Sequence, residues 1–122
     1  MQRFLKLLMA LAFASSFATV PASAHAFLDH AVPGVGTDVS GSPRELRLYF
    51  TQGVVVAFSG VKVASASGGA VPASKAVSDP SDPSVLIIHL GHTLAPGTYT
   101  VSWHVVSVDT HLTSGTFHFT VS

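Results

Sequence analysis

Two potential metal ligands, Asp109 and His111, stand one residue apart near the end of the chain. In an extended backbone, residues i and i+2 point to the same side and lie about 6.6 Å apart, at about 3.3 Å per residue. This spacing allows a carboxylate and an imidazole to converge on one ion. Two ligands are too few for a tight site, so other residues must complete it.

Residues 1–24 have the features of a secretory signal peptide. Arg3 and Lys6 give a positively charged start, residues 7–20 form an apolar run, and Ala22-Ser-Ala24 is a small-residue cleavage pattern. The run is shorter than the roughly 20 residues that span a bilayer, which argues against a membrane anchor. We therefore expect residues 1–24 to be removed and residues 25–122 to form the exported protein.

Cleavage after Ala24 makes His25 the first residue of the processed protein. An amino-terminal His offers its α-amine and its imidazole Nδ1, which can close a chelate ring on one metal ion. The α-amine has an ordinary pKa of about 7.7–8.0, so a metal ion can displace its proton near neutral pH. A His can also stand at this position by chance, but its combination with Asp109 and His111 favours a metal site.

The composition limits the classes of ligand and partner. Two of the six Lys and Arg residues lie in the predicted signal peptide, so residues 25–122 carry four basic and six acidic side chains. They contain no basic patch. Nucleic acid is therefore not an expected partner. There is no second apolar run long enough to span a membrane, so we expect no stable membrane insertion after cleavage. Cysteine is absent and both methionines, Met1 and Met9, lie in the leader, which excludes thiolate and thioether ligands and a blue-copper centre.

Residues 25–122 are enough for one modest domain, and their pattern favours β-structure throughout. Short strands are expected at residues 25–30, 45–50, 54–58, 61–64, 85–90, 98–108 and 115–121. Residues 65–84 are rich in Ser, Ala, Gly, Pro and Asp and indicate a long loop with one weak strand near 73–77. No capped helical pattern occurs after residue 24. About seven strands in this length predict an all-β fold, an antiparallel β-sandwich of Greek-key type.

Two aromatic residues of the 98–108 strand support this fold. Tyr99 follows a turn and resembles the tyrosine corner of such sandwiches, in which the hydroxyl bonds back to the backbone. Trp103 lies on the same face of the strand as Tyr99. We expect it in the core, with the lining of a ligand cleft as the alternative.

Most of the remaining histidines need no functional explanation. His118 alternates with two phenylalanines and is expected to face solvent, and His89 and His92 are expected at the surface. His30 is a candidate for binding a second, weaker ion. His104 is a candidate for a supporting role near the metal site.

Together these residues resemble the CopC family of periplasmic copper-binding and copper-resistance proteins, of the CopC/YobA type. The similar positions run from His25-Ala-Phe-Leu and Pro33 through Leu46-x-Leu-x-Phe50, Phe58-Ser-Gly-Val, Leu94-x-Pro-Gly-x-Tyr-x-Val-x-Trp103 and Ser107-x-Asp-x-His-x-x-x-Gly115. They span essentially all of residues 25–122. The combination of an amino-terminal His with Ser-x-Asp-x-His is the most specific part of the resemblance.

The resemblance implies a cupredoxin-like or immunoglobulin-like sandwich that binds one Cu(II) per chain at one end. It implies His25, Asp109 and His111 as the metal ligands, with His25 chelating through its amine and imidazole. It further implies a non-catalytic role in copper homeostasis, with possible delivery to a CopD-type inner-membrane protein. We expect a monomer. The ligand chemistry agrees, because nitrogen donors with a carboxylate suit Cu(II).

The chain departs from the family pattern at several positions. Gln52 stands where some members have a carboxylate near the copper, and the methionine-rich segment of a separate Cu(I) site is missing. His104 replaces a common Arg and Leu112 a frequent Pro. A two-site Cu(I)/Cu(II) carrier is therefore not expected.

Two other classes of protein compete with the copper carrier. Copper-dependent polysaccharide monooxygenases also begin with a His that clamps copper together with a second His, but this chain is small for their substrate-binding face and shows no aromatic platform. A metal-free adhesive sandwich leaves the pairing of His25 with Asp109-x-His111 unexplained. Oxidation of ascorbate or glycans separates an enzyme from a carrier.

Overall fold

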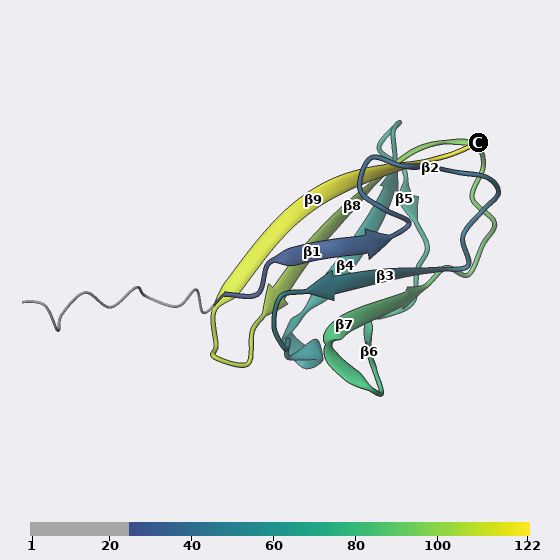
Figure 1. The fold of residues 1–122 in the computed structure, drawn as a ribbon. Coiled ribbons are helices and arrows are strands. Elements are labelled where there is room, and N and C mark those ends of the chain that lie inside the picture. Colours follow the sequence, from purple (N-terminus) through teal and green to yellow (C-terminus); the bar gives the residue numbers. More distant parts are fainter. Residues whose placement is uncertain (1–24) are drawn as a thin grey trace, which may run out of the picture.

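The computed structural model describes residues 25–122, which form a sandwich of two β-sheets (Figure 1). The predicted signal peptide, residues 1–24, lies outside the described residues. The first sheet has the order β1-β3-β7-β6, from strands Leu28–Val32, Glu45–Phe50, Asp82–His89 and Val77–Asp79. The second has the order β2-β9-β8-β4-β5, from strands Asp38–Val39, Leu112–Val121, Gly97–Val106, Gly60–Ser65 and Ala70–Val71.

The all-β sandwich is confirmed, but several details of the prediction are wrong. The described residues contain nine strands rather than about seven. The three additional strands are β2 and β5, which are two-residue pairings too short to leave a sequence pattern, and β6, which begins only at the end of the weak strand expected near 73–77. Residues 56–58 form a 3₁₀ turn, η2 (Val56–Phe58), instead of a strand. The expected loop at 65–84 contains β5, β6 and the start of β7. One pairing, β2 with β9, is parallel.

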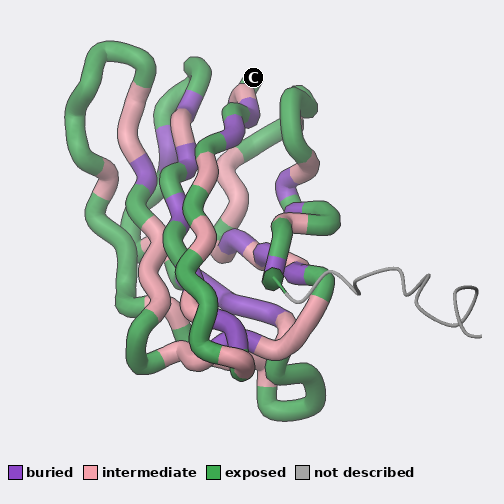
Figure 2. Tube along the Cα trace, turned by 90° about the vertical axis from the view of Figure 1, so that its left-hand side faces the viewer, coloured by how far each residue is buried: buried purple, intermediate pink, exposed green. Residues whose placement is uncertain are grey.

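Alternating burial in the long strands builds the core between the two sheets (Figure 2). In β3 every second residue is buried, and β8 and β9 repeat the pattern over most of their length, as a strand with one inward face requires. The largest fully buried side chains are Phe119, Leu46, Leu48, Leu86, Ile88, Val85, Val101 and Val105.

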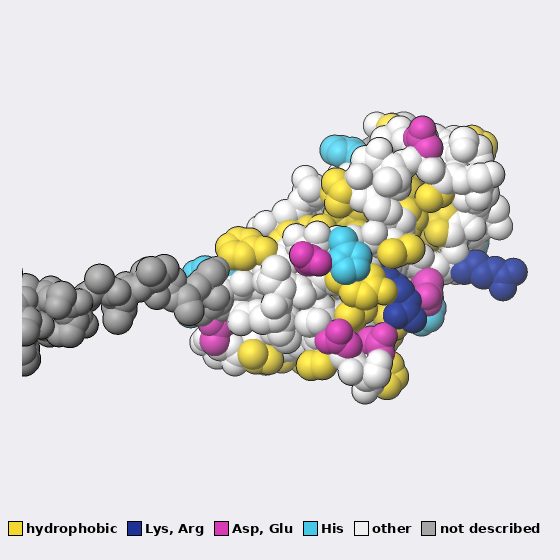
Figure 3. Space-filling model, viewed as in Figure 1, with side chains coloured by type: hydrophobic (Ala, Val, Ile, Leu, Met, Phe, Trp, Pro, Cys, Tyr) yellow, Lys and Arg dark blue, Asp and Glu magenta, His cyan; other side chains and the backbone are white. Residues whose placement is uncertain are grey.

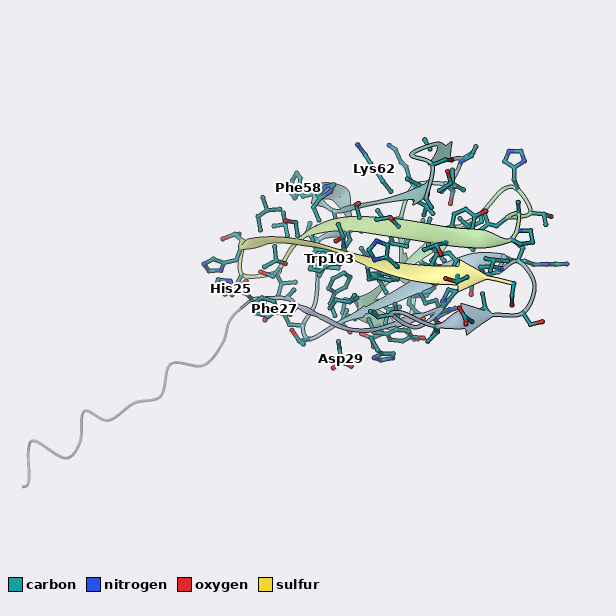
Figure 4. The ribbon with its side chains drawn as sticks, turned by 90° about the horizontal axis from the view of Figure 1, so that it is seen from above. His25, Phe27, Asp29, Phe58, Lys62 and Trp103 are labelled. Carbon is teal, nitrogen blue, oxygen red and sulfur yellow. The ribbon has the colours of Figure 1, made fainter. Side chains whose placement is uncertain are left out.

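Tyr99 and Trp103 both behave as expected. The Tyr99 hydroxyl donates to the carbonyl oxygen of Ala95 at 2.6 Å, which is the tyrosine-corner geometry. Trp103 is buried between the sheets, and its ring meets that of Phe50 edge to face with centroids 5.2 Å apart (Figure 4). It is therefore a core residue and does not line a cleft.

Gly115 makes room for the Trp103 ring on the neighbouring strand. A Cβ atom added at Gly115 would lie 2.6 Å from Cζ2 of Trp103. We expect Gly115→Ala to lower the free energy of unfolding by about 1–3 kcal/mol, the usual cost of overpacking. Urea denaturation measures this effect, and Gly91→Ala is the control, because nothing lies within 4 Å of its Cβ position. Equal stability of the two variants would contradict the close packing.

Two aspartates at the β6–β7 hairpin predict a loss of stability in acid. Hydrogen bonds from Ser81, with a further contribution from Arg47, lower the pKa of Asp79, and bonds from Ser84 lower that of Asp82. A carboxyl whose pKa is lower in the folded state stabilises the fold above its unfolded pKa of about 3.9, and this stabilisation is lost as the pH falls through the folded pKa.

We therefore expect the urea concentration at the unfolding midpoint to decrease as the pH is lowered below about 4, because these two groups become protonated. The Asp79→Asn variant should show a shallower fall than the unmodified protein. Asp38→Asn, which changes an exposed aspartate on β2, is the control. A fall of the same steepness in the unmodified protein and in Asp79→Asn would refute the assignment to Asp79.

Candidate metal centre

The loop that carries Asp109 and His111 joins β8 to β9 and is a tight turn, so the extended backbone expected here is wrong. The Ser107 amide donates to the His111 carbonyl at 2.9 Å, and the Thr110 amide donates to the Ser107 carbonyl at 2.8 Å. Thr110 has a φ of 71°, in the left-handed region that β-branched residues rarely adopt. The turn nevertheless brings the two expected ligands together, with His111 Nδ1 3.3 Å from Asp109 Oδ2.

Ser107 orients Asp109 from inside the protein, a role that sequence reasoning missed although Ser107 begins the Ser-x-Asp-x-His pattern. It is fully buried, and its hydroxyl donates to Oδ1 of Asp109. Oγ of Ser107 also accepts a hydrogen bond from the backbone amide of His111 at 3.2 Å. The Ser107 hydrogen bond is the main cause that lowers the pKa of Asp109; burial opposes it and His111 adds to it. Asp109 is therefore a carboxylate at neutral pH, available to a cation.

Gln52 also reaches this loop. Its Nε2 lies 3.4 Å from Asp109 Oδ1, so it contacts the site as its sequence position suggested. The amide of Gln52 carries no charge, so Asp109 supplies the negative charge among His25, Gln52, Asp109 and His111.

His25 is delivered to the same end by the two residues that follow it. Ala26 is fully buried, and its carbonyl accepts a hydrogen bond from Thr113 Oγ1 of β9 at 2.6 Å. Phe27 forms two hydrogen bonds with Thr51: its amide donates to the side-chain Oγ1 of Thr51 at 3.0 Å, and its carbonyl accepts from the Thr51 amide at 2.9 Å. These contacts attach the start of the described chain to both sheets. Thr51 and Thr113 were not identified from the sequence, since both lie just outside the expected strands, where a threonine carries no distinguishing signal.

The His25 and His111 rings consequently lie side by side. Their centroids are 4.4 Å apart and their planes are nearly perpendicular, at 85°. Figure 4 shows His25 and Phe27 together at one end of the sandwich. The structure thus brings all three expected ligands, His25, Asp109 and His111, to one place. Their side chains are not yet arranged around a common point: among residues 25–122, no three His, Asp or Glu side chains form a ready metal-binding group.

The donor chemistry suits a borderline metal ion that prefers nitrogen. Two imidazoles and one carboxylate lie near one another, and in the full sequence the His25 nitrogen is part of the peptide bond with Ala24. Removal of the predicted signal peptide would add a free amine at the same point. Such a set of donors fits Cu(II) better than Mg²⁺ or Ca²⁺, which prefer oxygen ligands.

The other histidines are placed elsewhere. His30 stacks on Tyr49 with centroids 4.1 Å apart and bonds to Asp29, and the His104 ring lies over Gly60 on the neighbouring strand. His118 is exposed, as predicted. His89 and His92 are likewise at the surface, and Nδ1 of His89 lies 3.7 Å from Oε2 of Glu45.

Comparison with known proteins adds to this geometry. Residues 28–122 match the CopC domain family. Protein YobA of Escherichia coli K12 is 39% identical over 107 residues, which cover 88% of this chain and 86% of YobA. The structure of CopC from Methylosinus trichosporium OB3b is similar with a TM-score of 0.75 and 33% identity, over 80% of this chain and 94% of that one.

PcoC, a methionine-rich copper resistance protein from Escherichia coli, is similar at a TM-score of 0.74 and 34% identity, over 81% of this chain and all of PcoC. Unlike that protein, this chain has no methionine after Met9. Among residues 25–122 no helix is long and apolar enough to cross a membrane. The matching family domain, the extent of these similarities and the shared sandwich lead to one conclusion: the chain belongs to the CopC family, whose members include copper resistance proteins.

Proposed function

We propose that this protein binds one Cu(II) ion per chain and sequesters copper in the periplasm as part of copper homeostasis and resistance. The observation that carries the proposal is the meeting of His25 and His111, with ring centroids 4.4 Å apart, beside the carboxylate of Asp109. Copper is the cargo of the protein, and no chemical conversion is assigned to it.

Each ligand has a distinct role. After cleavage of the leader, His25 chelates through its α-amine and imidazole, and His111 supplies another imidazole from the β8–β9 turn. Asp109 offsets part of the charge of the ion as an equatorial or axial ligand. Cu(II) is the divalent first-row ion that such a set binds most tightly, which favours copper over its neighbours in the series.

The supporting residues favour a defined site. Ser107 holds the Asp109 carboxylate, and Thr113 and Thr51 hold the backbone that follows His25 through the bonds described above. Partners that orient the ligands of a metal commonly change its affinity 10- to 100-fold. These bonds support a defined backbone position for both His25 and the Asp109–His111 turn.

The apolar side chains around the ligands favour transfer of the copper to another protein, for which a CopD-type inner-membrane protein is our candidate. Phe27, Val108 and Leu112 adjoin the ligands in sequence, and their exposed fractions are 49%, 64% and 68%. Exposed large apolar side chains that gather around a site are typical of protein–protein contacts.

The experiment is an EPR titration of the processed protein, residues 25–122, with Cu(II). We expect one tetragonal species with nitrogen hyperfine splitting that saturates at one equivalent. The same sample should oxidise ascorbate and glycans no faster than the metal-free protein. Turnover of either substrate would support the monooxygenase reading instead, and the absence of a saturating species would refute the site.

A further inference from the structure

A concave site lies on the side of the sandwich, and none of the three expected copper ligands lines it. It is a pocket of about 430 Å³ between the first half of β4 and the segment 73–76, which crosses from β5 to β6. Its volume is at the lower end of the range of small-molecule sites, roughly 300–1,000 Å³. Its lining residues are Val56, Ala57, Ser59, Gly60, Val61, Lys62, Ala73, Ser74, Lys75, Ala76 and His104.

The pocket is positively charged, although residues 25–122 as a whole contain more acidic than basic side chains. Two of the four basic residues after the leader, Lys62 and Lys75, line it, and no Asp or Glu does. Neither lysine forms an ion pair among residues 25–122, whereas Arg47 is paired with both Glu45 and Asp79 at 3.0 Å. Figure 4 shows Lys62 projecting outward beside β4. The face over β1 and β3, by contrast, mixes acidic and basic side chains (Figure 3).

His104 supplies a further donor to this pocket. Its ring lies directly over Gly60, where an added Cβ would be 2.5 Å from His104 Cε1. The absence of a side chain at Gly60 therefore allows the imidazole to lie against the strand as part of the pocket wall. The hydroxyls of Ser59 and Ser74 already serve the fold, through bonds to the Val55 carbonyl at 2.8 Å and from the His89 amide at 3.1 Å. The lysines and His104 are thus the polar groups left to meet a ligand.

The remainder of the lining is apolar and comes from small aliphatic side chains. They are Val56, Ala57, Val61, Ala73 and Ala76. A fully hydrated inorganic ion would gain nothing from this part of the wall, whereas a molecule with an apolar body would bury it there. A pocket with two unpaired ammonium groups and an apolar wall matches an anion of mixed character.

We propose that this pocket binds a small organic anion, with its carboxylate or phosphate group between Lys62 and Lys75 and its apolar body against the Val and Ala side chains. The imidazole of His104 donates a hydrogen bond to the anion. The pocket contains none of the proposed copper ligands, so the outcome of its test does not depend on whether the protein binds copper.

The test is an NMR titration of metal-free protein, residues 25–122, with hexanoate and hexyl phosphate. We expect saturable amide shifts confined to residues 56–62, 73–76 and 104. Inorganic phosphate and hexanol, which each lack one half of the ligand, should bind at least about threefold more weakly. A hexyl phosphate preference would identify a phosphate head group and a hexanoate preference a carboxylate. Equal binding of hexanol, or shifts spread over the whole surface, would overturn the proposal.

Matched variants locate the charge that matters. Lys62→Gln and Lys75→Gln should each weaken the binding about two- to fivefold, the effect of losing one partly exposed charge pair. Arg44→Gln removes the same charge from an exposed residue outside the pocket and should leave the affinity unchanged. If Arg44→Gln weakens the binding as much as the lysine variants do, the attraction is nonspecific and the assigned site is wrong.

Discussion

One alanine added before His25 is expected to weaken Cu(II) binding by on the order of 10²–10⁴-fold. This is the gain in affinity that two linked donors, here the α-amine and the imidazole of His25, have over two separate donors. The added residue converts the α-amine of His25 into an amide and moves the free amine one residue further out. The imidazole stays beside His111, because Ala26 and Phe27 still anchor the backbone. The chelate ring is lost and the fold is retained.

Competition with a calibrated Cu(II) chelator measures the affinity, and EPR shows the loss of a coordinated nitrogen. An alanine added after Ser122 is the matched control, because it lengthens the chain equally at its other end. Identical EPR spectra and affinities for the two extended proteins would show that the amino-terminal chelate does not exist. Unfolding curves in urea should superimpose for both.

His111→Ala is expected to lower the Cu(II) affinity by more than about 100-fold. Removing a residue that only orients a metal ligand costs up to about 100-fold, and removing a ligand itself should cost more. His111 stands between the other two ligands, next to the His25 ring and 3.3 Å from Asp109. Its ring is about half exposed, with 52% of the side chain accessible, so its removal leaves no cavity in the core. The loss should appear in metal binding and not in stability.

His118→Ala is the control for this variant. His118 is an exposed imidazole on the same strand, β9, that follows the His111 turn, and its replacement removes one potential ligand from the chain without touching the site. We expect its copper affinity and EPR spectrum to match those of the unmodified protein. Equal losses in the two variants would mean that copper binds to surface histidines in general.

Local pattern was sufficient to predict the sandwich and several of its details. The alternation in β3 and β9, the apolar run in β7 and the turn before Tyr99 each reflect the environment of one strand, which its own residues encode. The short strands β2 and β5 were missed because a two-residue strand is too short to leave a pattern, and β2 also depends on β9, a partner far along the chain. The 3₁₀ turn at Val56–Phe58 was expected to be a strand, and the Val55 amide just before it bonds to Val106, which is likewise far along the chain.

For the candidate site, the sequence alone supplied the residue types: His25, Asp109 and His111 as donors, without any sulfur ligand. Only the tertiary structure decided that these residues meet. Ala26 bonds to Thr113 and Phe27 to Thr51, contacts that span 87 and 24 residues and hold the start of the domain against the β8–β9 turn. A sequence pattern records which face of a strand is buried, but it does not record which strand ends lie together. That depends on how two sheets pack around one core, and this packing places His25 beside His111.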